Sequence, residues 1–291
     1  MKKSIIKLLC VLTLISMSAC GVEDAGENSG AVMDVVREDV NFSGESEIIF
    51  DDNDLIIKIT SVELMESDIR CGLYIENNST YNLAFGVQKA VISVNNLMVP
   101  FYDYEFDCEV ASGKSANAYL NIDQSVLDAD DIKGIERLDI LLWVFDNDDE
   151  FKQSVFNTGR IGIVLADGTT EFERSGQELL NEDDIAIKLY INDERNYEFL
   201  LCNNSGKDIY YEITELSVNG CAFAESDCFE NVLFNGKQAL FEVEVSEEFL
   251  RNNGLEKVDN IEFNVNYRSY QNDDYNIMKI GPVIYELGKA E

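Results

Sequence analysis

The sequence predicts an all-β chain that folds as two tandem antiparallel β-sandwiches. Three observations support this prediction: apolar and polar residues alternate in short segments from Asp51 onward, turn residues separate these segments, and the second half of the chain repeats motifs of the first. Alternation with a period of two places every second side chain on one face of a strand. Short strands separated by turns at a spacing of about 8–12 residues are typical of sandwiches.

In the first half, the pattern predicts seven strands in sequence. They cover residues 55–59, 71–75, 87–94, 97–101, 116–122, 135–145 and 161–165. Turn-forming residues join several of them, at Asn77-Asn78-Ser79, Asn95-Asn96 and Gly113-Lys114. Between the fifth and sixth strands, Ser125 can cap a short helical corner that extends to Asp131.

The second half repeats this order. Residues 184–188 match 54–58, and Asn203-Asn204-Ser205 matches Asn77-Asn78-Ser79. The remaining matches are 216–220 with 92–96, Gly236-Lys237 with Gly113-Lys114, 258–263 with 135–140, and 279–281 with 160–162. Because many motifs recur in one order at near-equal spacing, the sequence predicts a duplicated domain. We place the first sandwich at 46–166 and the second at 180–291.

The first twenty residues have the layout of a secretory signal peptide. Lys2, Lys3 and Lys7 precede an apolar stretch at 8–15, and small residues lead to Cys20. The apolar stretch is far shorter than the ~20 residues of a membrane-spanning helix. We therefore expect a signal peptide at 1–19, followed at 20–45 by an acidic, flexible spacer.

The residues before Cys20 resemble the lipobox of bacterial lipoproteins, although Met17 stands where that motif usually has Leu. The resemblance implies that Cys20 becomes the mature N-terminus and carries acyl chains such as palmitate. Two chains on one residue hold a protein stably on a membrane, here on its extracellular face. The alternative is an ordinary signal peptide cut near Ala19, with Cys20 unmodified.

The charge balance restricts the partners. The 291 residues include 22 Lys and Arg against 56 Asp and Glu, a net charge of -34, so the chain repels nucleic acid and anionic polymers. Cations, basic proteins and neutral glycans remain as the classes of partner that this charge permits. The chain has no His, which removes the common nucleophile triads and most zinc sites. We expect no cofactor and no enzymatic activity, with a paired-carboxylate hydrolase as the remaining catalytic option.

The cysteine positions do not define a disulfide framework. Apart from Cys20, the mature chain contains five, and none forms a Cys-x-x-Cys pair: Cys71, Cys108, Cys202, Cys221 and Cys228. An odd number leaves at least one thiol free or paired with another chain. Cys71 with Cys108, and Cys221 with Cys228 or Cys202, are the pairings within one domain, and the sequence leaves the connectivity open.

The recurring motifs resemble the tandem immunoglobulin-like (Ig-like) lipoproteins of Gram-positive, largely anaerobic bacteria. The matching features are the Val-Asn-Gly hairpin at 218–220, the Gly-Lys pairs before a strand, and the Ile-x-x-Ile strand after a helical corner. The resemblance covers about residues 50–287 and implies an Ig-like architecture without the Cys…Trp…Cys spacing of antibody domains. It assigns no activity to any residue.

Two clusters are candidate sites. Tyr102, Tyr104 and Phe106 crowd one segment, where exposed rings stack on sugars or anchor a protein partner and buried rings form core. Asp146, Asp148 and Glu150 have the one-three-five spacing of a calcium loop, but Phe151 and Asn157 replace the Gly and Glu that such a loop requires. Solvated loop residues are the alternative, and turn chemistry explains the Asn-x-Ser sequences at 77 and 203 without glycosylation.

These observations predict a monomeric, lipid-anchored protein of the bacterial cell surface. It would bind an extracellular protein or glycan through its tandem Ig-like domains. A structural spacer in an envelope assembly is the second hypothesis, and a carboxylate-dependent surface hydrolase is the third.

Overall fold

The computed structural model describes ten segments of the chain. They are 38–65, 67–86, 90–100, 102–123, 134–149, 154–165, 176–193, 195–223, 230–270 and 277–287. By its internal contacts the chain divides after Ala31, and every described residue belongs to the unit Val32–Glu291.

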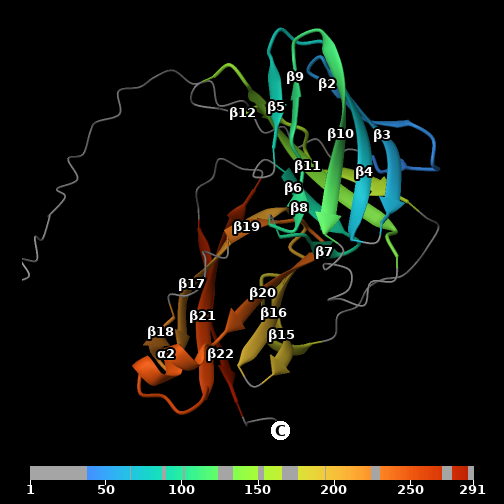
Figure 1. Ribbon diagram of the computed structural model, residues 1–291. Helices are drawn as coiled ribbons and strands as arrows, with labels where there is room; N and C mark the ends of the chain where they lie inside the picture. Colours follow the sequence, from blue (N-terminus) through green and yellow to red (C-terminus); the bar gives the residue numbers. More distant parts are fainter. Residues whose placement is uncertain are drawn as a thin grey trace, which may run out of the picture. The chain divides into compact units, whose positions relative to one another are not determined.

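The regular secondary structure of the described residues is almost entirely strands (Figure 1). The first half contains β1 (Val40–Asn41), β2 (Glu47–Asp52), β3 (Leu55–Leu64), β4 (Asp68–Asn77), β5 (Leu83–Phe85), β6 (Ala90–Val94), β7 (Leu97–Met98), β8 (Tyr104–Glu105), β9 (Cys108–Val110), β10 (Lys114–Asp123), β11 (Arg137–Asp146), β12 (Ser154–Asn157) and β13 (Ile161–Val164). The second half contains β14 (Gln177–Glu182), β15 (Ile185–Asp193), β16 (Asn196–Asn203), β17 (Ile209–Val218), β18 (Cys221–Ala222), β19 (Glu230–Leu233), β20 (Lys237–Glu244), α2 (Glu247–Asn252), β21 (Asn260–Ser269) and β22 (Met278–Glu286).

The first half is a sandwich with Ig-like connectivity. One sheet has the order β2-β3-β4-β10-β8, and the facing strands run β1-β13-β11-β6-β7. In the Ig fold, strands A, B, E and D form one sheet and C, F and G the other. Here β3, β4, β10 and β8 correspond to strands A, B, E and D, and β6, β11 and β13 correspond to strands C, F and G. Alternate residues of both sheets fill one core, including Ile57, Leu73, Ile92 and Ile140.

The second half repeats this pairing. Strands β14-β15-β16-β20 form one layer, β18-β17-β21-β22 form the other, and β19 pairs with β17. Their core includes Ile187, Phe199, Val218 and Phe263. The helix α2 follows β20, and its N-cap Ser246 accepts a hydrogen bond from the backbone N–H of Phe249. The prediction of an all-β chain of antiparallel, Ig-like sandwiches is therefore confirmed.

One strand pair of the first half is buried on both faces. In β6 and β11, Ile92 and Ile140 point into the first core, whereas Val91 and Leu141 belong to the core cluster of the second half. Strands covered on both sides are buried at consecutive positions rather than at alternate ones, as residues 90–94 and 138–142 are, and they are mostly apolar apart from Ser93 and Asp139. The two cores therefore lie on opposite faces of the same two strands, β6 and β11.

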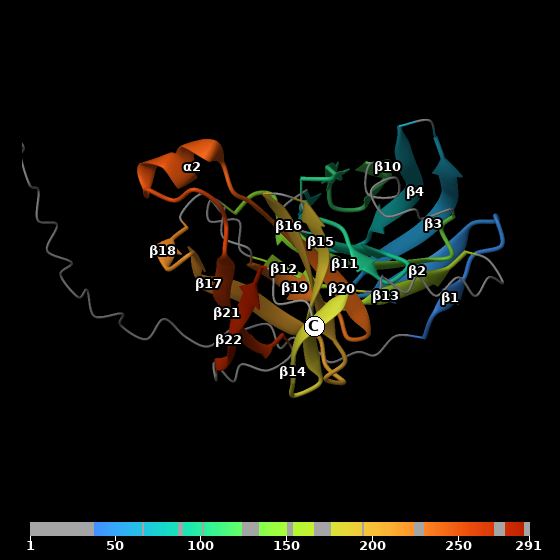
Figure 2. The same ribbon diagram turned by 90° about the horizontal axis from the view of Figure 1, so that it is seen from below.

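The halves are also joined by backbone pairing. β7 lies parallel to β20, with Leu97 opposite Gln238, so a single twelve-stranded sheet passes from one half into the other. Figure 1 labels the two strands of this pair, and Figure 2 labels the two ends of the sheet, β1 and β14. A second parallel pair, β1 with β13, sits at the far end of the same sheet.

Matching turns have matching geometry in the two halves. Asn53-Asp54 and Asp183-Asp184 both adopt positive φ, as do Asn95 and Asn219, each with φ of 52°. Gly113 and Gly236 also adopt positive φ, a conformation that suits glycine, directly before β10 and β20. These correspondences describe the geometry, and an origin by duplication stays a prediction from the sequence motifs.

Several expected elements differ in extent. The strand expected at 97–101 ends at Met98, and β7 is a two-residue strand between β6 and β20. Strands β1, β2, β5, β8, β9, β12, β14 and β19 and the helix α2 were not predicted. The spacer expected to extend through residue 45 is too long, because Val40 pairs with Ile163 and is part of the fold. Residues 87–89 and the helical corner at 125–131 lie outside the described residues.

Candidate functional site

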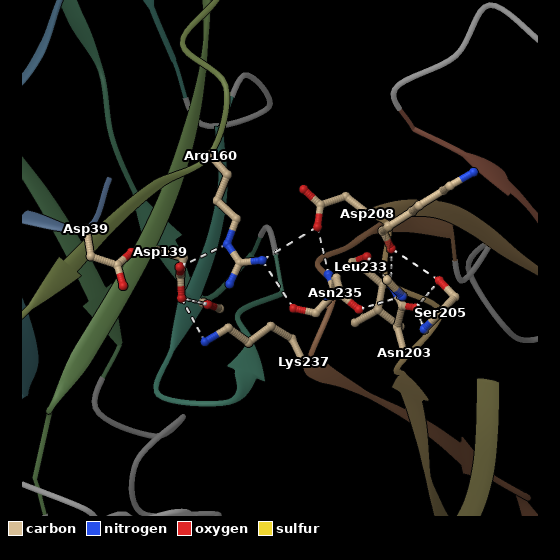
Figure 3. Close-up of polar contacts among 12 residues, drawn as sticks. Asp39, Asp139, Arg160, Asn203, Ser205, Asp208, Leu233, Asn235 and Lys237 are labelled. Carbon is tan, nitrogen blue, oxygen red and sulfur yellow. Dashed lines mark hydrogen bonds and ion pairs between the residues drawn. The ribbon is translucent and has the colours of Figure 1, made fainter. Parts of the chain in front are cut away.

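The densest group of charged side chains surrounds Asp139, which is fully buried on the side of β11 that faces the second half. Its carboxylate accepts hydrogen bonds from Arg137 Nη2 at 2.8 Å, from Arg160 Nε at 2.9 Å and from Ser93 Oγ at 3.1 Å. Lys237 Nζ lies 2.7 Å from Asp139 Oδ2. Figure 3 shows Arg160 and Lys237 converging on this carboxylate.

Two of these cations connect the halves. Lys237 is the first residue of β20 and donates to Asp139 and to the backbone carbonyl of Asn95. Arg160 precedes β13 and donates to the carbonyl of Asn235 at 3.1 Å, with its guanidinium 3.6 Å from Asp208 Oδ1. These contacts, drawn in Figure 3, span the boundary between the two sandwiches.

A further carboxylate fixes the start of the fold. Asp39 accepts two hydrogen bonds from Arg137, at 2.6 and 2.7 Å, next to the parallel pair β1–β13. A Cβ at Gly162 would displace the ends of both side chains, so the glycine leaves room for this pair. We call the group the ionic junction: Asp39, Arg137, Asp139, Arg160, Asp208 and Lys237.

The electrostatics of the ionic junction favour the ionised forms of its side chains. Burial alone would raise the pKa of Asp139, but hydrogen bonds from Arg137 and the charges of Lys237 and Arg160 outweigh it and hold that pKa well below its usual range. Burial lowers the pKa of Lys237, which faces two guanidinium groups besides its carboxylate partner. With three carboxylates against three cations, the group is neutral overall. It suits fixing geometry rather than transferring protons.

Two equivalent asparagines close the turns after β4 and β16. Asn77 donates to the carbonyls of Tyr81 and Val110, both at 2.8 Å, and accepts from the N–H and hydroxyl of Ser79. Asn203 does the same with Lys207, Leu233 and Ser205 (Figure 3). Both side chains are fully buried, so turn chemistry accounts for these Asn-x-Ser sequences.

The aromatic candidate cluster separates into core and surface. Tyr104 and Phe106 are 4% and 1% exposed, and the Tyr104 hydroxyl donates to the Ala90 carbonyl at 2.6 Å. The hypothesis that these two rings contact a partner is therefore wrong, because β8 extends the sheet and turns them into the first core. Tyr102 is 73% exposed and remains accessible.

The acidic candidates form local turn contacts. Asp146 Oδ1 accepts from the Asp148 backbone N–H at 3.0 Å, and Asp148 accepts from the Asn82 amide at 2.7 Å. Glu150 lies outside the described residues. Within the segments that the structure describes, no group of three or more acidic or thiol side chains is arranged to hold a metal ion.

In the segments that the structure describes, four cysteines are free thiols: Cys71, Cys108, Cys202 and Cys221. Burial raises the pKa of Cys71 to about 12 and that of Cys108 to about 11. The thiolate is the reactive form of cysteine, so these two side chains act as small apolar core residues. Cys228 lies outside the described residues.

A second surface was not predicted from the sequence. On the outward side of β3, β4 and β10, a cation lies over each of two tyrosine rings: Lys58 Nζ is 5.4 Å from the Tyr74 ring centroid, and the Arg70 guanidinium is 5.6 Å from that of Tyr119. We call this surface the tyrosine face: Lys58, Arg70, Tyr74, Asn117, Tyr119 and Asn121. The signal that could have identified this surface is a tyrosine at a polar, outward position in each of two strands with an alternating apolar pattern.

The described residues contain no helix long and apolar enough to cross a membrane. No family model matches the chain, and no curated protein sequence matches it. Among solved structures, CBD12 from CALX1.2 is 9% identical with a TM-score of 0.19, covering 70% of this chain and 76% of that one.

Red sea bream transglutaminase is 6% identical with a TM-score of 0.20, covering 74% of this chain and 29% of that one. The secreted serine protease VesC from Vibrio cholerae is 11% identical with a TM-score of 0.17, covering 75% and 48%. This chain thus spans less than a third of the transglutaminase and about half of the protease. At these scores the similarities carry no argument about function.

Proposed function

We propose that this chain is a lipid-anchored protein of the bacterial cell surface that binds an extracellular partner through two Ig-like sandwiches and acts without catalysis. The tyrosine face carries the proposal. It is an open sheet surface with an accessible aromatic ring, Tyr119, which is 56% exposed. Exposed tyrosines held in place by neighbouring side chains bind at a low cost in conformational entropy.

A comparison of the two halves supports this assignment. The position equivalent to Tyr74 is Leu200, opposite Leu240 as Tyr74 is opposite Asn117. Leu200 is fully buried together with Ala186 and Cys202, and Leu240 packs against both this cluster and the first core. The same side of the sheet is thus covered in the second half and open in the first.

The anchoring part of the proposal rests on residues 1–20. Lipidation at Cys20 predicts that the protein partitions into the detergent phase, and that Cys20→Ala moves it to the aqueous phase because the two acyl chains are lost. A Cys10→Ala variant is the matched control and should stay in the detergent phase. Unchanged partitioning of Cys20→Ala would exclude the lipid anchor.

The binding part is tested by cross-linking the purified full chain to intact cells or extracellular matrix and identifying what it captures. A saturable partner is the expected result. If nothing is captured, the result favours the second hypothesis, that the protein is a rigid spacer. The ionic junction favours that alternative, and so do strands β6 and β11, which pack against both cores, because both features stiffen the connection between the halves.

A further inference from the structure

We propose that the tyrosine face docks a second copy of this chain, related to the first by a twofold axis. This inference rests on the proposed binding function, which it deepens by naming the partner, and it departs from the monomer expected from the sequence. A twofold interface uses one surface patch twice, so the patch must be complementary to itself. The register of the strands gives the tyrosine face this property.

Opposite charges lie on either side of a central row of the sheet. Lys58 on β3 is opposite Tyr74 on β4, and two positions further along β4 is Gly72. Two positions beyond Gly72, Arg70 is opposite Glu63 on β3. A twofold axis that runs across the strands through Gly72 exchanges the two outer rows. It therefore places Lys58 of one copy over Glu63 of the other, and Tyr74 over Arg70.

The neighbouring strand β10 follows the same symmetry. Asn117 is in the row of Lys58, Tyr119 is opposite Gly72, and Asn121 is in the row of Glu63. The axis thus passes Tyr119, which is 56% exposed, and pairs Asn117 with Asn121 of the second copy. Carboxamides both donate and accept, so these two side chains can hydrogen-bond to each other.

The two charges that meet in this arrangement are available to a partner. Among the described residues, neither Lys58 nor Glu63 forms an ion pair. Glu63 is exposed, and Lys58 is held over the Tyr74 ring. Because the axis applies to both copies, the interface contains the Lys58–Glu63 contact twice.

The balance of charge favours a second copy over a basic or an acidic partner. Such a partner would be matched by an excess of one charge, whereas here Lys58 and Arg70 are balanced by Glu63 and by Glu105 on β8. The net charge of -34 repels a second copy over most of the surface, and this region is locally neutral. The other carboxylates of the outward side stand at the strand ends, where water solvates them: Asp68, Glu76 and Asp123.

The composition and the size of the surface suit a protein interface. Ile48, opposite Lys58 on β2, is 49% exposed, and tyrosine and arginine are enriched at interfaces. Strands β3, β4 and β10 have ten residues each, so the sheet is about 33 Å long and about 20 Å wide with its edge strands. That footprint is of the order of the ~800 Å² that each partner contributes to a standard interface. Sheets that pack face to face keep their strands within about 30° of each other, as this arrangement requires.

The test is sedimentation equilibrium of the full chain in density-matched detergent. A salt concentration of about 0.15 M shortens the Debye length to about 8 Å and screens the long-range repulsion. We expect a concentration-dependent equilibrium between monomer and dimer. Lys58→Glu and Glu63→Lys should each weaken dimerisation by at least about tenfold, because each brings like charges together twice. Glu109→Lys and Lys114→Glu, which reverse exposed charges outside the three rows, are the matched controls and should leave dimerisation unchanged.

A mixture of the two variants tests the geometry itself. When Lys58→Glu meets Glu63→Lys, each contact again joins a carboxylate and an ammonium group, so the mixture should dimerise although neither variant does so alone. The double variant should dimerise by itself for the same reason, and this recovery also shows that the substitutions leave the fold intact.

A wild type that stays monomeric, a dimer that both single variants preserve, or a mixture that does not recover would each overturn the inference. If the chain is monomeric while cell-surface cross-linking captures another protein, and Tyr119→Ala prevents that capture, the second copy is excluded and the proposed binding function stands. If cross-linking captures nothing either, both proposals fail.

Discussion

The most discriminating perturbation of this fold is Lys237→Met, paired with Lys114→Met as its control. Both lysines follow a glycine with positive φ, and each backbone N–H donates to the carbonyl three residues earlier at 3.1 Å. The local geometry is therefore the same. Lys237 is 4% exposed and reaches Asp139 in the other half, whereas Lys114 is exposed to solvent.

The size of the effect follows from what each lysine contacts. Removing one partner of a buried ion pair typically costs about 3–5 kcal/mol, because the other charge is left uncompensated. Asp139 would keep Arg137 and Arg160, so we expect Lys237→Met to cost about 3 kcal/mol, at the lower end. Methionine fills a similar volume, so a cavity contributes little. Lys114→Met should change stability by less than about 0.5 kcal/mol, as at most surface positions.

Thermal unfolding monitored by near-ultraviolet circular dichroism measures both variants. For a chain of this size, about 3 kcal/mol corresponds to a Tm lower by about 6–12 °C. Hydrogen exchange gives a local readout, because the Gln238 backbone N–H, which donates to the Asn96 carbonyl across the boundary at 2.8 Å, should lose protection in Lys237→Met alone. Equal Tm values for the two variants, or unchanged protection at Gln238, would refute the role of the ionic junction in joining the halves.

Two further predictions concern buried polar groups. The cations around Asp139 hold its pKa below the unfolded value of about 3.9, so its contribution to stability is complete above that pH and is lost as the pH falls through the lower folded-state pKa. The unfolding free energies of wild type and Asp139→Asn, measured by urea titration, should therefore differ by a constant amount from pH 8 to pH 5 and converge below about pH 4; a difference that does not change with pH would contradict this. Asn203→Ala and Asn77→Ala each remove four hydrogen bonds inside a turn and should each cost about 2–4 kcal/mol. The exposed neighbour Asn204→Ala is the control, and a loss confined to one of the two halves would show that the turns are not equivalent.

Much of the fold could be predicted because it depends on local chemistry. Alternation in 55–59 marks one buried and one more accessible face, and β3 shows it, whereas in β15 Ala186 is buried as well because the other side of that strand is covered. Asn95 and Asn219 each adopt positive φ and use their side chains to hold the chain before β11 and β21, through the backbone N–H groups of Glu136 and Asp259. Such residues identify turns without any knowledge of what surrounds them.

The candidate site was harder to predict for the opposite reason. Tyr102, Tyr104 and Phe106 alternate as a short strand does, but acidic neighbours made the segment resemble a loop. The pairing of Tyr104 with Ile122 on β10 turned two of the rings inward. Tyr119 is surrounded by residues that suit any strand, and its exposure depends on the absence of a covering element over β10 in the described segments.

The sequence by itself determined the all-β class, the turns and the matching motifs of the two halves, since each follows from side-chain period and from residues that tolerate particular backbone angles. Only the tertiary structure decided which of two equivalent surfaces is covered. Lys114 and Lys237 share one motif, yet β7 of the first half lies beside β20 and places a buried carboxylate within reach of Lys237 alone. Burial depends on what packs across a sheet, and the backbone carbonyl that Lys237 also meets, that of Asn95, is 142 positions away in the chain.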